Sequence, residues 1–84
     1  MGTTAKAFSV EFGKVVRKAR LQKGISQEEL GFRCNFDRTY VSRVELGKVN
    51  LSLQAAWLLA VGLDIPLERL ISEAEQFKNS DSAS

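Results

Sequence analysis

The stretch SQEELGFRCNFDRTYVSRVELGK, residues 26–48, has the spacing of two short helices joined by a tight turn. Gly31 lowers helix propensity by ~1 kcal/mol relative to Ala, which indicates that another helix approaches closely at this point. Asn35 tolerates the left-handed backbone that a tight turn requires. The inward-facing positions are apolar: Leu30, Cys34, Phe36, Val41 and Val44. The stretch therefore predicts two helices that cross steeply.

Capping residues mark where these two helices begin and end. Ser26, followed three residues later by Glu29, forms a capping box at the start of the first helix. Asp37 is a favourable N-cap for the second helix, and this role is preferred to contact with a base. The second helix is predicted to run to about Leu46 and to end at Gly47.

Helical spacing continues on both sides of this stretch, and no strand-like alternation appears. Upstream, an apolar stripe predicts a helix that ends near Gly24. Its members are Phe8, Phe12, Val15, Val16 and Ala19. Downstream, Ser52 caps a helix over residues 53–62, with Gly62 at its end. Pro66 then suits the first turn of a last helix that extends as far as Phe77.

These segments together predict an all-α chain of five short helices. The ordered domain is expected over residues 8–77. Residues 1–7 are expected to be a flexible start, and residues 78–84, which are small and polar, a disordered tail.

Composition excludes several classes of function. The 84 residues contain one Cys and no His, so a Ser-His or Cys-His catalytic pair and a Cys-based zinc site are impossible. We therefore expect that the protein is not an enzyme and that it binds no metal, cofactor or small-molecule substrate. Cys34, at an inward position, is interpreted as a small core residue. No signal peptide is recognisable and the longest apolar run is residues 55–61, so we expect a cytoplasmic protein that does not span a membrane.

Charge is distributed unevenly along the chain. Residues 1–25 carry six Lys and Arg side chains and one Glu, whereas residues 51–84 carry two basic and five acidic side chains. A basic N-terminal segment favours an anionic partner, although a solvated helix with scattered lysines is an equally good interpretation of this pattern alone.

The quoted stretch resembles the helix-turn-helix of the phage repressor and Cro family, also called the XRE family. The positions that carry the resemblance are Gln27, Leu30, Gly31, Asn35, Val41, Ser42, Val44, Glu45 and Gly47. GKVVRKARLQKGISQ, residues 13–27, resembles the first helix of that family, and the likeness spans about residues 8–71. DRTYVS followed by GKVNLSL most resembles controller proteins of restriction–modification systems. These are small all-helical dimers that regulate transcription of restriction genes.

The resemblance implies that residues on the third helix enter the major groove of an operator in double-stranded DNA. Arginine can bind guanine through two hydrogen bonds, and threonine or serine can contact a thymine methyl or several base edges. The expected base-contacting residues are Arg38, Thr39, Tyr40, Ser42 and Arg43. Tyr40 could instead reach a phosphate or pack its ring beside the helix pair. The expected phosphate contacts are Gln27, Lys48, Asn50 and Arg17.

Other charged residues of the motif have structural explanations. In the family, the pair that corresponds to Arg20 and Glu45 usually forms a salt bridge between the first and third helices. Lys14, Lys18 and Lys23 are interpreted as a solvated face. Leu46 departs from the pattern, because controller proteins often carry Arg there, so the operator should differ from those of close relatives.

The fourth helix, in LSLQAAWLLAVGL, is apolar on nearly all its faces. A helix of this kind is buried on more than one side, which predicts self-association as a two-fold homodimer. The expected interface residues are Trp57, Leu67, Leu70 and Ile71. The alternative is a monomer with a crowded core.

The sequence therefore predicts a dimeric DNA-binding regulator that helps or blocks RNA polymerase near a promoter. A phage-type repressor remains an alternative, as does an antitoxin-like module whose last two helices hold a partner protein.

Overall fold

The computed structural model describes the backbone of residues 5–83 and the side chains of residues 6–76. Over this range the elements are helices only, which confirms the all-α prediction. Their bounds are α1 Ala5–Gln22, α2 Gln27–Cys34, α3 Arg38–Glu45, α4 Leu53–Leu63 and α5 Leu67–Ala83. Residues 1–4 of the predicted flexible start, and Ser84 of the predicted tail, lie outside the described residues.

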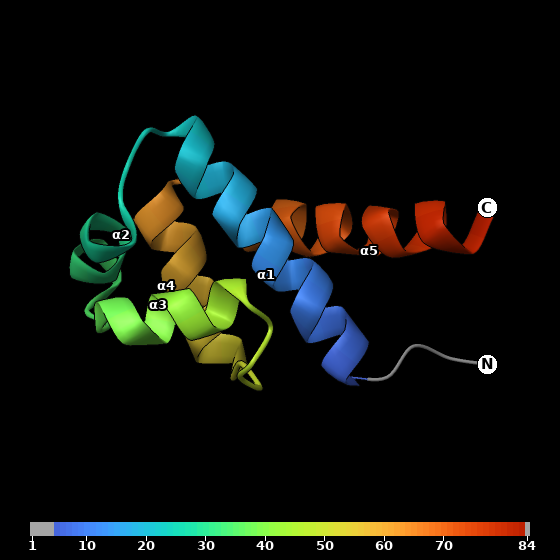
Figure 1. Cartoon of the computed structure of the whole chain (residues 1–84). Coiled ribbons are helices and arrows are strands. Elements are labelled where there is room, and N and C mark those ends of the chain that lie inside the picture. Colours follow the sequence, from blue (N-terminus) through green and yellow to red (C-terminus); the bar gives the residue numbers. More distant parts are fainter. Residues whose placement is uncertain (1–4, 84) are drawn as a thin grey trace.

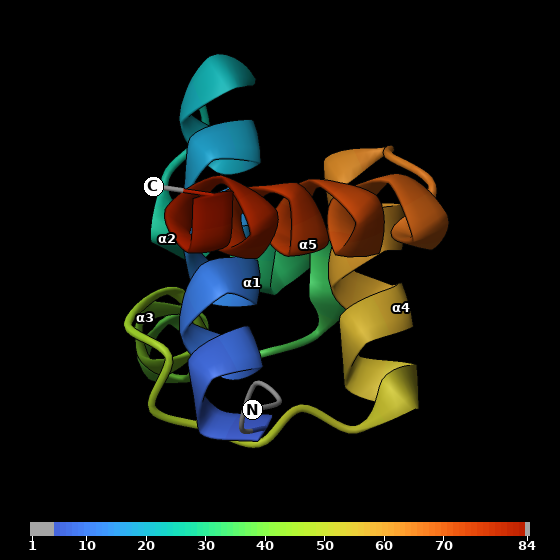
Figure 2. The same ribbon diagram turned by 90° about the vertical axis from the view of Figure 1, so that its right-hand side faces the viewer.

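Helices α2 and α3 meet at one end of the molecule, and α1 crosses between them and the start of α5 (Figure 1). Turned by 90°, α3 and α4 lie on opposite sides of the N-terminal half of α1 (Figure 2). Helix α5 packs along α1 and continues past it. Residues 78–83, for which the sequence predicts disorder, continue this helix. They contain neither Gly nor Pro, so nothing in them interrupts helical hydrogen bonding.

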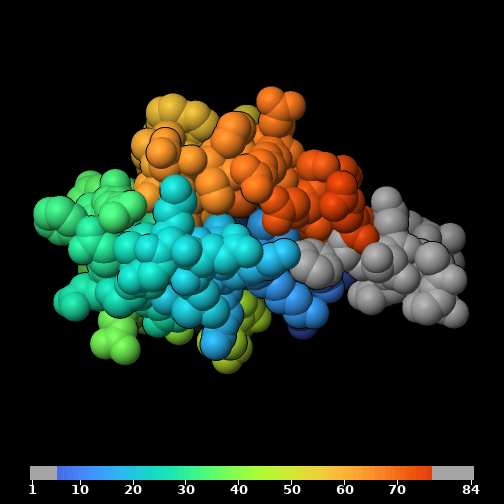
Figure 3. All heavy atoms as spheres, turned by 90° about the horizontal axis from the view of Figure 1, so that it is seen from above, coloured from blue at the N-terminus to red at the C-terminus, as the bar shows by residue number. Residues whose placement is uncertain are grey.

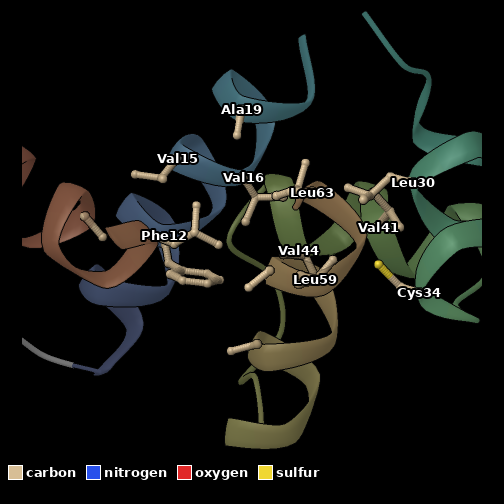
Figure 4. Packing of buried hydrophobic residues seen from close by; sticks show 14 residues of the cluster. Phe12, Val15, Val16, Ala19, Leu30, Cys34, Val41, Val44, Leu59 and Leu63 are labelled. Atoms are coloured by element: carbon tan, nitrogen blue, oxygen red, sulfur yellow. The ribbon is translucent and has the colours of Figure 1, made fainter. Parts of the chain in front are cut away.

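The core lies where the inward faces of the helices converge (Figure 4). Phe12 and Val16 of α1, Leu30 of α2, Val41 of α3 and Leu59 of α4 are almost fully buried. Side chains from α1, α3 and α4 point toward one another in this view. This single apolar core fixes the helices relative to one another, so α3 is presented on a rigid support.

Two of the three expected N-caps make the predicted hydrogen bond. The Ser26 hydroxyl accepts from the backbone N–H of Glu29 at 3.0 Å, and the Ser52 hydroxyl accepts from that of Ala55 at 3.0 Å. Asp37 occupies the N-cap position of α3, but its side chain makes no capping hydrogen bond. The prediction for Asp37 is therefore right in position and wrong in interaction.

The end of α4 differs from the sequence prediction. Helix α4 continues through Leu63, and the left-handed residue that ends it is Asp64, with φ of 59°. Gly62 instead lies within the last turn, where a Cβ atom would collide with Sγ of Cys34. The glycine is needed because α2 approaches α4 closely at this point. Cys34 is buried as expected and its thiol donates to the carbonyl of Leu58 at 3.3 Å, while burial raises the pKa of the thiol.

Candidate nucleic-acid interface

Helix α3 is held against the rest of the domain by its inward side. Val41 and Val44 are fully buried in the core. Gly13 of α1 lies under the last turn of α3, where a Cβ atom would collide with the carbonyl oxygen of Val44. Gly47, with φ of 73°, ends the helix beside Val10. The two backbones therefore touch, and α3 cannot roll on α1 without breaking this contact.

A buried polar cluster fastens α3 to its two neighbouring helices. Nε and Nη2 of Arg20 donate to the two carboxylate oxygens of Glu45, at 2.6 and 3.0 Å. Nη1 of Arg20 donates to the carbonyl of Ile25 at 2.9 Å, and Nε2 of Gln27 donates to Glu45 at 3.1 Å. Glu45 on α3 thus joins α1 and α2, which confirms the expected salt bridge. The hydrogen bond with Glu45 raises the pKa of Arg20, so the guanidinium stays charged.

The opposite side of α3 presents hydrogen-bonding groups to solvent. Arg38, Thr39 and Arg43 are exposed, and Ser42 is half-buried beside them. Among the described side chains, neither Arg38 nor Arg43 forms an ion pair. Both guanidinium groups can therefore donate to an external acceptor without losing an internal partner.

The ring of Tyr40 packs beside the helix pair, which is one of the alternatives predicted for it. Its ring packs on Phe36 with the ring centroids 4.7 Å apart, and the side chain is half-buried. Burial raises the pKa of the Tyr40 hydroxyl, which therefore stays protonated at neutral pH and can donate a hydrogen bond. Tyr40 supports the start of α3, and a contact between its hydroxyl and DNA stays a prediction.

The expected phosphate contacts do not all lie free at the surface. Arg17, Lys48 and Asn50 are exposed, and Arg17 lies one turn from Arg20 on the side of α1 that faces α3. In the space-filling view, α1 lies between α4–α5, in orange, and α3 with the segment after it, in green to yellow-green (Figure 3). Gln27 differs, because its side-chain amide donates to Glu45. Its backbone N–H, in the first turn of α2, is the group left for a phosphate.

The predicted dimer residues fall into three groups by exposure. Trp57 is more than half exposed on α4, whereas Leu67 and Ile71 are half-buried and pack against the core. Leu70 is only 1% exposed, so it belongs to the core of its own chain and cannot offer a surface to a second one. The prediction of Leu70 as an interface residue is therefore wrong.

Sequence interpretation missed several residues that shape these surfaces. Leu53 and Val61 are more than half exposed and lie four residues on either side of Trp57, so the three residues form an apolar stripe on α4. Phe32 is 82% exposed on α2. Gly13 could have been recognised by the argument applied to Gly31, because a glycine inside a helix indicates close approach of a neighbour.

Other kinds of site find no support in the described part of the chain. None of its helices is long and apolar enough to cross a membrane. No group of three or more metal-ligating side chains occurs among the same residues.

Comparison with known proteins identifies a matching family and similar control proteins. The helix-turn-helix family profile matches residues 16–70. The control protein C.MunI from Mycoplasma sp is 38% identical over 68 residues, which cover 80% of this chain and 92% of the relative. The control protein C.BamHI from Bacillus amyloliquefaciens is 51% identical over 43 residues, which cover 50% of this chain and 53% of the relative.

A solved structure shows the same likeness in three dimensions. The restriction–modification controller protein C.AhdI from Aeromonas hydrophila superposes with a TM-score of 0.72 at 45% sequence identity. The superposition covers 74% of this chain and 94% of that protein. The residues matched by the family profile, 16–70, include α2, the turn and α3.

Proposed function

The chain belongs to the helix-turn-helix family, and we propose that it is the controller protein of a restriction–modification system, a DNA-binding regulator that reads its operator through α3. The observation that carries this proposal is the two-sided character of α3. One side is fixed by the core and the Arg20–Glu45 pair, while the other exposes Arg38, Thr39 and Arg43. A helix held rigidly and lined with such donors suits the major groove.

Arg38 and Arg43 are proposed to contact base edges, with Thr39 and Ser42 contacting bases or nearby phosphates. Arg38 opens the helix, which is the end that reaches base edges in helix-turn-helix proteins. Arg17, Lys48, Asn50 and the backbone N–H of Gln27 are proposed to bind phosphates. These contacts position the protein and make its affinity depend on salt concentration.

We propose further that the protein acts as a two-fold dimer through α4. The stripe of Leu53, Trp57 and Val61 is exposed in the single chain, and burying it would remove apolar surface from water. A dimer of this kind would present two copies of α3 to half-sites about one DNA turn apart, ~34 Å, on a near-palindromic operator. Bound near a promoter, such a dimer would help or block RNA polymerase.

The same stripe is what favours a second candidate, a module that holds a different protein through α4. Sedimentation of the isolated chain at micromolar concentration separates the two. A dimer supports the controller proposal, and a monomer that stays monomeric on addition of operator contradicts it.

The DNA contacts can be tested by selecting bound sites from random duplex DNA and measuring affinity for the selected operator. We expect Arg38→Ala and Arg43→Ala each to weaken binding by roughly 5- to 150-fold, the loss of one bidentate base contact. Arg69→Ala is the matched control, because Arg69 carries the same charge but lies on α5, paired with Glu73 at 3.3 Å. If both α3 variants bind like the parent chain, the interface is assigned wrongly.

A further inference from the structure

Leu46 is an apolar side chain on an otherwise polar face. It is 56% exposed although it follows directly on the buried Val44 and Glu45. The family resemblance implies an arginine at this position in related proteins. Neither the core nor the proposed dimer stripe includes Leu46. An exposed leucine on the helix proposed to read DNA has no explanation in the stability of the domain.

The backbone places Leu46 on the same face as the proposed base contacts. Its N–H donates to the carbonyl of Ser42 at 3.1 Å, and its φ of −87° and ψ of −2° keep it in the helical region. Leu46 therefore continues the helical turn, three residues after Arg43, four after Ser42 and seven after Thr39. Residues at these spacings lie side by side along one face of a helix.

The backbone that follows Leu46 is also held in place. Gly47 turns the chain with a positive φ against Val10, and the N–H of Lys48 donates to the carbonyl of Arg43 at 2.9 Å. The proposed dimer stripe lies on the exposed side of α4, whereas α3 lies on the core side, where both helices bury apolar side chains. A second copy bound to that stripe would therefore leave Leu46 uncovered.

A leucine can neither donate nor accept a hydrogen bond, so it gains nothing from phosphates or from the polar edges of bases. The one apolar group in the major groove is the methyl group on C5 of a pyrimidine. We propose that Leu46 reads the C5-methyl group of a pyrimidine at one position of each operator half-site. This inference rests on the proposed function, since it requires α3 to lie in the major groove.

The C5-methyl group has two sources, thymine and 5-methylcytosine, and both present it in the same place. The proposal would make Leu46 a specificity-determining residue. It selects a methylated pyrimidine where an arginine would select a guanine.

The test pairs one change in the protein with one change in the DNA. Each thymine of the selected operator is replaced in turn by deoxyuridine, which removes only the methyl group, and binding is measured with the parent chain and with Leu46→Ala. At one position per half-site, we expect deoxyuridine to weaken DNA binding by the parent chain about fourfold per methyl group. This ratio corresponds to the transfer free energy of one such group. Leu46→Ala should not respond to the methyl at that position.

Leu21→Ala is the matched control. Leu21 is 55% exposed, so the substitution removes the same exposed side chain from α1 instead of α3. The Leu21→Ala chain should respond to deoxyuridine as the parent does. To distinguish the two sources, the thymine–adenine pair at the sensitive position is replaced by a cytosine–guanine pair, with and without a methyl group on C5 of the cytosine. If Leu46 reads the methyl group from either base, the methylated cytosine should be bound more tightly than the unmethylated one by the parent chain and not by Leu46→Ala.

The outcomes separate this inference from the proposed function. If the parent chain selects no duplex, the proposed function fails and this inference fails with it. The inference about Leu46 is overturned by itself if the parent chain binds the operator and Arg43→Ala weakens that binding, but removal of each methyl group changes binding by the parent chain no more than binding by Leu46→Ala. Repeating the selection with Leu46→Ala gives an independent check, because the preference for thymine should disappear at that position.

Discussion

Helices α3 and α4 bury one face in the same core, yet they expose opposite chemistry. Helix α3 exposes Arg38, Thr39 and Arg43, which are all hydrogen-bonding side chains. Helix α4 exposes the stripe of Leu53, Trp57 and Val61. Both exposed sides face away from the core that the two helices share. The arrangement separates a polar surface suited to a DNA groove from an apolar surface suited to a second protein chain, so each can be occupied without blocking the other.

The two helices are also supported differently. Helix α3 is short, and besides two buried valines it depends on the ion pair between Glu45 and Arg20. Helix α4 is attached chiefly by apolar contacts, through Leu59, Leu63 and Ala60, and by the close approach of Gly62 to Cys34. Two hydrogen bonds from α2 add to these contacts, one from the Cys34 thiol to the carbonyl of Leu58 and one from Arg33 to the carbonyl of Gly62. Among the described residues no ion pair involves α4, so the loss of an ion pair should disturb α3 first.

Glu45→Ala should have the largest effect, because it removes the polar support of α3. It leaves the buried guanidinium of Arg20 without its carboxylate, which costs about 3–5 kcal/mol when one member of a buried pair is removed. The expected result is a fall of that size in the free energy of unfolding, measured by urea denaturation at fixed protein concentration.

Two further variants control this experiment. Glu29→Ala breaks the exposed pair between Glu29 and Arg33, so it should change stability by less than about 1 kcal/mol. The double variant Arg20→Met, Glu45→Leu should lose less than Glu45→Ala alone, because no buried charge is stranded. A loss of similar size from Glu29→Ala and Glu45→Ala would contradict the role given to the buried pair.

Trp57→Ala should act on the other surface. Truncating a tryptophan at the centre of an interface commonly costs at least about 2 kcal/mol, so the proposed dimer should dissociate roughly 30-fold more readily. Sedimentation equilibrium measures this directly. Phe32→Ala is the matched control, since Phe32 is also an exposed aromatic residue but lies on α2. Dissociation on Phe32→Ala with an intact dimer on Trp57→Ala would remove α4 from the interface.

The smallest expected effects concern the N-termini of the two helices. Ser52→Ala removes the capping hydrogen bond of α4 and should lower the free energy of unfolding by about 1 kcal/mol. Asp37→Ala at the start of α3 should cost less, because its side chain makes no capping hydrogen bond. Thermal or urea unfolding of both variants compares them. Equal losses would mean that Asp37 does cap α3 in solution.

Sequence could predict the parts of the fold that depend on local rules. The turn at Asn35, the caps at Ser26 and Ser52 and the inward positions of α2 and α3 follow from backbone preference and helical periodicity. The Arg20–Glu45 pair was predicted through family resemblance instead, because its members lie on different helices.

What sequence could not predict depends on contacts between distant segments. Local rules predict that Gly62 ends a helix, yet the glycine is needed because Cys34, on another helix, packs against it. Leu67, Leu70 and Ile71 share one apolar pattern, and only packing against α1 shows that Leu70 is the innermost. The apolar α4 indicated an extra partner, but which of its residues stay exposed depends on where the core lies.

We propose that DNA binds α3 while a second copy of the chain binds α4. The change in amide chemical shifts of the isotope-labelled protein on addition of the selected operator tests both assignments. We expect the largest changes at residues 38–46 and nearly unchanged signals for Leu53, Trp57 and Val61. The largest changes at those three residues, with residues 38–46 unaffected, would contradict this proposal.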